Sequence, residues 1–261
     1  DKTMKLYFRY LGMLLRCQMQ YRLSFLMTII GQFLVSFTAF AGVYFMLARF
    51  HRVDGYSFSE ILICFSVVLA AFAFAECFFR GFDSFQRLIN SGSLDRLLVR
   101  PRGVVFQVLT SSMEFSRIGR LAQAVIMLVY ALLTCEIDWN PARVLTLILM
   151  LVSGVTVFAS LFVMHAGVSF FTIEGLEFTN ILTDGSREFA RYPLSIYGRG
   201  ILRIYTYVVP IALFQYWPFL YLTGRSEDMR LMLAPLAAML FVIPCAAVFR
   251  LGLRKYQSAG S

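Results

Sequence analysis

The sequence predicts an all-α polytopic membrane protein with six transmembrane helices, an N-terminal interfacial amphipathic helix and both termini in the cytoplasm. Three observations predict this class. Of the 261 residues, 59% are hydrophobic, a share above that of usual soluble domains, and the mean hydropathy is +0.71. The apolar residues form long runs, and about 20 residues at about 1.5 Å each cross a bilayer core of about 30 Å. Arg-rich and Arg-poor segments alternate between these runs.

Residues 4–22 are expected to form a helix that lies in the headgroup layer of the membrane. Lys5, Arg9 and Arg16 share one helical face, and the opposite face is apolar. An ordinary solvated helix would show the same periodicity. The direct run into an apolar stretch from Ser24 favours the interfacial position.

A single transmembrane domain is expected over 1–261, and its connections are short. The six candidate spans are the main apolar runs of the chain, 24–48, 61–79, 118–135, 144–171, 204–222 and 231–249. Asp54-Gly55 forms a turn after the first run, and Trp139 is placed to anchor the turn after the third.

The charged stretch 174–203 has two interpretations. Five charges between Glu177 and Arg191 argue against lipid contact and favour a cytoplasmic loop. The alternative is a polar fifth span that faces the protein interior, with 204–222 as a re-entrant hairpin. Pro210 and Pro218 support the alternative because each would break a straight helix. The loop is the preferred interpretation.

The orientation follows from the distribution of Lys and Arg. The N-terminal segment, 80–102, 187–203 and the C-terminal tail together carry seventeen basic residues, whereas the three intervening loops carry five. Basic residues concentrate in cytoplasmic loops. Both termini are therefore expected in the cytoplasm. The same rule explains the net charge of +9 without a nucleic-acid partner.

Signatures of catalytic sites are missing from the sequence. The three lysines, Lys2, Lys5 and Lys255, do not lie in a phosphate-binding Gly-Lys-Ser/Thr loop. His51 and His165 are too far apart for an HExxH zinc site, and no GxSxG motif occurs. The five cysteines form no CxxC pair and are expected to be packing thiols. We expect no catalytic, cofactor-binding or metal-binding residue in this chain, and a hydrogen-bonded interior role for His165.

The segment 82–101, after the second apolar run, is the best functional candidate. Ser91-Gly92-Ser93 is expected to break one short helix, and Ser93 to cap the next, with Asp95 near its positive end. Pro101 ends that second helix. Such a capped helix, apolar on one side and basic on the other, suits docking into the groove of a partner. A helix lying on the membrane surface fits the same pattern equally well.

Glu76 is the one acidic residue deep inside an apolar run. Intramembrane acids face a cavity or a cation, and Arg80 lies four residues further on, at the spacing of a helical ion pair. The ion pair is the preferred interpretation, and a cation or proton site is the alternative. Phe72, Phe74 and Phe78 are candidates to line a hydrophobic cavity for lipophilic or cationic cargo.

Three stretches carry a resemblance to a known family. GSLDRLLVRP at 92–101 resembles the cytoplasmic-loop signature of the permease subunits of type-2 ABC exporters, in a bacterial branch of that family. EFARYP at 188–193 and YQSAGS at 256–261 are similar to two further hallmarks of the branch. The likeness extends over essentially the whole chain.

The resemblance implies a permease subunit in the bacterial cytoplasmic membrane that exports a lipophilic or amphipathic substrate, such as a drug, antibiotic, peptide or lipid-like molecule. It implies a separate ATPase subunit that binds ATP and Mg, and a second permease that is either a related chain or an identical copy. It also implies re-entrant helices before the last span. The coupling helix that contacts the ATPase would lie within 85–98. The contact residues would be Phe85, Gln86, Arg87, Asn90, Gly92, Ser93, Leu94, Asp95 and Arg96.

Two other functions fit the residues. A proton-coupled secondary transporter would use Glu76 and would move its substrate without an ATPase. A membrane scaffold would have a fully packed interior and no transport path.

Overall fold

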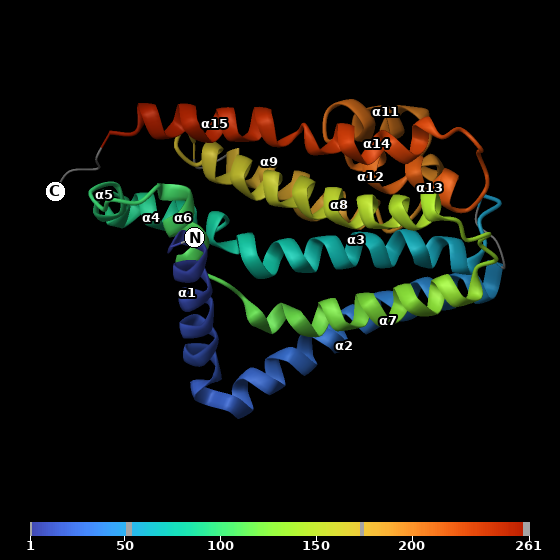
Figure 1. Ribbon diagram of the computed structural model, residues 1–261, viewed down its shortest axis with the longest axis horizontal. Helices are drawn as coiled ribbons and strands as arrows, with labels where there is room; N and C mark the ends of the chain where they lie inside the picture. Colours follow the sequence, from blue (N-terminus) through green and yellow to red (C-terminus); the bar gives the residue numbers. More distant parts are fainter. Residues whose placement is uncertain (1, 51–53, 173–174, 258–261) are drawn as a thin grey trace.

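Every regular element of the described chain is a helix. The computed structural model describes residues 2–50, 54–172 and 175–257, and no strand occurs within these ranges. The long helices run side by side along the molecule, and short helices gather at its two ends (Figure 1). The expected all-α class is therefore confirmed.

The elements follow one another along the chain in a simple order. They are α1 (Lys2–Gln18), η1 (Met19–Tyr21), α2 (Arg22–Phe50), α3 (Phe58–Phe79), η2 (Arg80–Phe82), α4 (Phe85–Asn90), α5 (Ser93–Leu98), α6 (Val104–Ser111), η3 (Phe115–Arg117), α7 (Ile118–Thr134), α8 (Pro141–Val168), α9 (Gly175–Asn180), η4 (Ile181–Gly185), α10 (Ser186–Phe189), η5 (Leu194–Tyr197), α11 (Arg199–Tyr207), α12 (Ile211–Gln215), α13 (Trp217–Leu222), α14 (Arg230–Met239) and α15 (Val242–Lys255).

α1 turns sharply into α2. It runs across the direction of the long helices, whereas α2 leads into the bundle (Figure 1). The Gln18 side chain holds the junction, because it donates to the Met113 carbonyl and accepts from the Phe115 amide. Tyr7 and Leu11 pack against a small buried cluster of Cys77, Met113 and Phe115. This direction suits a helix in the headgroup layer, which stays a prediction.

α3 is the central helix of the bundle. Its start is fixed by a capping box, in which Ser57 Oγ accepts from the Glu60 amide while the Glu60 carboxylate accepts from the Ser57 amide at 2.8 Å. From Ile61 to Cys77 the helix is buried almost continuously, because α7 and α8 pack along it. α3 is hydrophobic on all of its faces, as expected for a helix that other helices surround.

α14 and α15 together form the last long helical stretch, which pairs with α8. A break separates them at Leu240 and Phe241. Pro244 explains the break, because it has no N–H to donate to the Leu240 carbonyl. The Ile243 amide bonds that carbonyl instead, at 3.0 Å.

The segment after α8 runs back along α3. The Arg187 guanidinium lies 4.6 Å from the centre of the Phe72 ring. Further on, the Ser195 hydroxyl lies 3.1 Å from that of Tyr56, in the turn that precedes α3. The preferred interpretation of 174–203 as a cytoplasmic loop is therefore wrong for the part that the structure describes, which excludes residue 174. The alternative, a polar segment facing the interior, matches the observed path.

The run 204–222 is not one straight span. It divides into the end of α11, then α12 and α13, and these short helices cluster with α14 at the end of the bundle away from the termini (Figure 1). Pro210 precedes α12 and Pro218 lies in the first turn of α13, so neither can donate the hydrogen bond that would continue the preceding helix. The expected single fifth span is corrected to a series of short helices, and their re-entrant position in the membrane stays a prediction.

Five stretches within the described ranges are long and apolar enough to cross a bilayer. They are Lys5–Phe45, Phe58–Asn90, Phe115–Thr134, Pro141–Val168 and Arg230–Lys255. A sixth crossing would have to come from the polar segment that starts at α9. The two chain ends and α4 to α6 lie at one end of the bundle (Figure 1).

The corrected path changes the charge count behind the orientation. Arg187 and Arg191 lie beside α3, and Arg199 and Arg203 belong to α11 at the opposite end. The predicted orientation stays the same. Most of the basic residues still lie in the N-terminal segment, in 80–102 and at the end of α15.

Candidate functional site: an end hairpin and an interior ion-pair network

α4 and α5 form a tight helical hairpin at the end of the bundle where the termini lie (Figure 1). Gly92 makes the turn with φ of 63°, a left-handed conformation that glycine adopts without strain. Gly92 is also the N-cap of α5, so the expected capping role of Ser93 is wrong. The Ser93 hydroxyl instead bonds the Ser91 hydroxyl at 2.6 Å and donates to the Leu88 carbonyl at 3.3 Å.

Two apolar side chains anchor the hairpin to the bundle. Phe85 and Leu94 are 0% exposed. The Phe85 ring centre lies 5.2 Å from that of Phe170, beyond the end of α8, and 5.4 Å from that of Phe249 on α15. Both residues were expected to touch an ATPase subunit. Their burial corrects that expectation and makes them the connection between the hairpin and the long helices.

The outer surface of the hairpin carries polar and basic side chains, with Leu98 exposed at its end. Arg87, Asn90 and Arg96 are exposed, and Gln86 donates to the Asn90 side chain at 2.9 Å. The remaining expected contact residues are half-buried, namely Gly92, Ser93 and Asp95. A partner that approaches this end therefore meets cationic and amide side chains on a rigid support.

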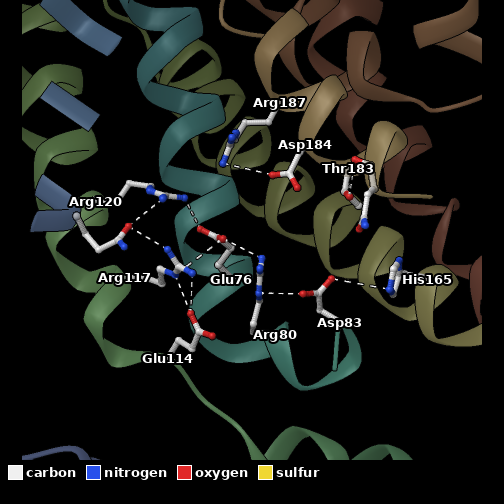
Figure 2. A network of polar contacts seen from close by, with 12 residues as sticks. Glu76, Arg80, Asp83, Glu114, Arg117, Arg120, His165, Thr183, Asp184 and Arg187 are labelled. Carbon is white, nitrogen blue, oxygen red and sulfur yellow. Dashed lines mark hydrogen bonds and ion pairs between the residues drawn. The ribbon is translucent and has the colours of Figure 1, made fainter. Parts of the chain in front are cut away.

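Glu76 lies at the centre of a buried ion-pair network (Figure 2). Its side chain is 4% exposed. Arg80 Nη1 lies 3.0 Å from Oε1, as the four-residue spacing predicts, and Arg120 Nη1 on α7 lies 2.5 Å from Oε2. Arg117 Nε is 3.9 Å from Oε1, and Gln32 on α2 accepts from both Arg117 and Arg120 at 2.9 Å. The network thus joins α2, α3 and α7.

The same network continues to the base of the hairpin (Figure 2). Arg80 Nε lies 3.1 Å from Asp83 Oδ2, and Asp83 is two residues before α4. The other Asp83 oxygen lies 3.9 Å from His165 Nε2 on α8, and His165 Nδ1 bonds the Thr179 hydroxyl on α9 at 2.6 Å. An ion pair with Arg80 therefore connects the base of the hairpin to the Glu76 network, and Asp83 also lies near His165 on α8.

Phe72, Phe74 and Phe78 do not line one cavity. Phe72 is 0% exposed and packs edge-on against Phe158 at 5.0 Å, inside the core. Phe74 is 40% exposed on the outer surface of α3, with its ring centre 4.7 Å from that of Phe78. The expectation of a shared cargo cavity at these rings is wrong.

A match to a family model identifies the kind of protein. The model described as ABC-2 family transporter protein matches residues 33–260, a range that holds α3 to α15, the hairpin and nearly all of the ion-pair network. The chain belongs to the ABC-2 transporter family. ABC-2 proteins are multi-pass membrane subunits of ABC transporters, and the family works with ATP-binding subunits. Searches of curated proteins and of solved structures found no match for this ABC-2 protein.

Sequence reasoning missed most partners of Glu76 in this ABC-2 protein. Arg117 and Arg120 lie at the entry of the expected span 118–135, and their three-residue spacing places both on one helical face. This shared face was the feature of the sequence that could have indicated a common acidic partner. The contribution of Gln32 has no comparable signal, because an isolated amide in an apolar run gives no indication of which helix it will meet.

Proposed function

We propose that this ABC-2 protein is the permease subunit of an exporter and that its α4–α5 hairpin is the element that receives the power stroke from a separate ATPase subunit. The ATPase binds ATP and Mg, and this chain contributes the membrane path. The substrate is lipophilic or amphipathic and leaves the cytoplasm or the inner leaflet of a bacterial membrane. A second permease, related or identical, completes the path.

One observation carries the proposal, namely the mechanical continuity between the hairpin surface and the bundle. Arg87 and Arg96 face outward, whereas Phe85 and Leu94 on the same hairpin are fully buried in the core. Asp83, two residues before α4, pairs with Arg80 and is thereby connected to the Glu76 network. These contacts connect the hairpin to α3 and, through Glu76 and Arg120, to α7, which is the connection that the proposed power stroke requires.

Closing of two ATPase subunits on ATP would pull two such hairpins toward each other. The attached helices would then rock as rigid bodies and move substrate outward, as transporter halves do in alternating access.

The test is affinity capture of the tagged full chain from its own membranes in mild detergent, with Arg96→Glu compared with the unmodified protein. We expect Arg96→Glu to lower the recovery of a nucleotide-binding subunit about tenfold, because reversing a charge at an interface costs at least ~1.4 kcal/mol.

Arg230→Glu is the matched control, because Arg230 is exposed at the start of α14, at the far end of the bundle. Equal recovery of the ATPase subunit with both variants would contradict the assigned contact. Failure to capture any nucleotide-binding subunit with the unmodified chain would contradict the proposal as a whole.

A further inference from the structure

Three arginines converge on one small cavity inside the bundle. The cavity has a volume of about 60 Å³ and is lined by the guanidinium-bearing side chains of Arg120, Arg187 and Arg191, together with small and apolar residues of α2 and α3 that include Ser36 and Ala39. The arginine side chains are only 10%, 19% and 23% exposed. The space suits a group of a few heavy atoms, because a single water needs about 10–15 Å³ on this kind of measure.

The lining of this cavity is cationic without an acidic counterpart. No Asp or Glu is among the described residues that form its wall. Arg187 lies 2.9 Å from Glu188 and 3.5 Å from Asp184, and Arg191 also pairs with Glu188. Those two carboxylates are 45% and 54% exposed, so they stand in a more open environment than the guanidinium groups they contact.

The guanidinium groups have more N–H donors than the contacts described for them use. Each carries five N–H donors. Among the described residues, Arg191 has Glu188 as its ion-pair partner and stacks over the Phe65 ring at 5.5 Å. Arg120 donates one Nη to Glu76 and the other to Gln32. The carboxylate partners of the three arginines, Glu76, Asp184 and Glu188, all lie outside the wall. An anion in the cavity would therefore add a further ligand to arginines that are already paired.

We propose that this cavity is a binding site for an oxyanion, that is, a carboxylate, phosphate or sulfate group. Arginine forks match the planar or tetrahedral arrangement of such oxygens and bind them through paired, charge-assisted hydrogen bonds. Charged side chains at membrane depth mark ion or substrate paths. We assign the apolar part of an amphiphile to the α2 side of the cavity, because Val35 lines the cavity and is 61% exposed.

The anion can belong to an amphiphile or be a free inorganic ion, and the chemistry of recognition is the same. That the bound amphiphile is a transported molecule rests on the proposed function, whereas the binding itself does not. Binding is therefore measured on the full chain alone, in an uncharged maltoside detergent. A negative binding result would then contradict the anion site without bearing on the result of the ATPase capture experiment.

The measurement is the ligand-dependent shift in melting temperature, titrated with three probes: dodecyl phosphate, inorganic phosphate and dodecyltrimethylammonium. We expect saturable stabilisation by a phosphate probe and none by the cationic amphiphile. Stabilisation by dodecyl phosphate alone assigns the site to amphiphiles, and stabilisation by inorganic phosphate as well assigns it to the free anion. Equal stabilisation by the cationic amphiphile would overturn the proposal.

Two variants locate the binding. Arg191→Gln removes one cation. We expect it to raise the half-saturating concentration of the stabilising phosphate probe about tenfold, because a charge-assisted hydrogen bond is lost. Ala39→Leu keeps all three charges and fills the cavity, and we expect it to abolish saturable binding.

The controls are Arg199→Gln, at an exposed arginine of α11, and Thr38→Leu, at the exposed position next to Ala39. Both should bind as the unmodified protein does. Unchanged binding in Ala39→Leu would overturn the proposal, even if the arginine variant failed to fold.

Discussion

Glu76 is the residue on which the charges of the bundle converge. Its two oxygens contact Arg80 in η2, directly after its own helix, and Arg120 on α7, and Arg117 lies just beyond at 3.9 Å. The helical spacing predicts the Arg80 contact from sequence. The α7 contacts depend on how two distant helices pack, which a single sequence does not reveal. The buried carboxylate therefore fixes the register of α3 against α7.

Replacing Glu76 with Gln should destabilise the protein strongly. The change removes a buried negative charge and leaves three guanidinium groups without it, for which we expect a loss of about 3 kcal/mol. Thermal unfolding in detergent measures the effect.

Glu227→Gln, at an exposed position in the turn before α14, is the control and should change the melting temperature little. The double variant Glu76→Gln with Arg120→Gln should recover part of the loss, since it removes both members of a pair. Equal melting temperatures for Glu76→Gln and the control would contradict the assigned role.

At the scale of elements, α2 and α7 meet at unusually short range. A Cβ built on Gly119 would lie 2.1 Å from the carbonyl oxygen of Ile29. Only glycine permits this approach, and the approach brings Gln32 within reach of Arg117 and Arg120. The α2–α7 contact thus holds α2 against the network through packing as well as charge.

Gly119→Ala should force α2 away from α7, because the obstructing atom belongs to the backbone and cannot rotate aside. We expect a loss of about 1–3 kcal/mol in thermal unfolding, typical of overpacking.

Gly31→Ala is the matched control on α2, since its Cβ would meet nothing within 4 Å. Alanine there should be neutral or stabilising by up to ~1 kcal/mol. A melting temperature lowered as much by Gly31→Ala as by Gly119→Ala would contradict the close-contact explanation.

At the scale of the whole molecule, the chain has two different ends. One end holds the start of α1, the end of α15 and α4 to α6 (Figure 1). The other end holds the short helices α11 to α13 and a clamp in which Arg225 bonds both Glu60 oxygens, at 2.6 and 2.9 Å, and lies 4.3 Å from the centre of the Tyr56 ring. The distribution of basic residues predicts that the first end faces the cytoplasm.

Cysteine accessibility in intact cells tests that orientation. In a Cys17→Ser background, which removes the exposed native thiol, Val99→Cys should react with a membrane-impermeant maleimide only after the membrane is opened. Val99 is 85% exposed beside the hairpin.

Glu227→Cys, at the far end, should react in intact cells and serves as the positive control. Labelling of Val99→Cys from outside, with Glu227→Cys protected, would invert the orientation.

The sequence by itself determined the helical class, the membrane setting, the family and the short helical hairpin after the second run. The class and the membrane setting follow from the length of the apolar runs, and the break between the two short helices follows from Ser91-Gly92-Ser93. The family follows from the resemblance of residues 92–101, 188–193 and 256–261. It also contained the prolines that break 204–222, although composition alone left their consequence open.

The tertiary structure decided what depends on segments that lie far apart in the chain. It placed Arg187 and Arg191 against α3 rather than in a loop, buried Phe85 and Leu94, and brought Arg120 to Glu76. Charge alone cannot distinguish a solvated loop from a polar segment lining an interior, because both tolerate ionised side chains. The distinction depends on which partners packing supplies, and only the folded bundle supplies them.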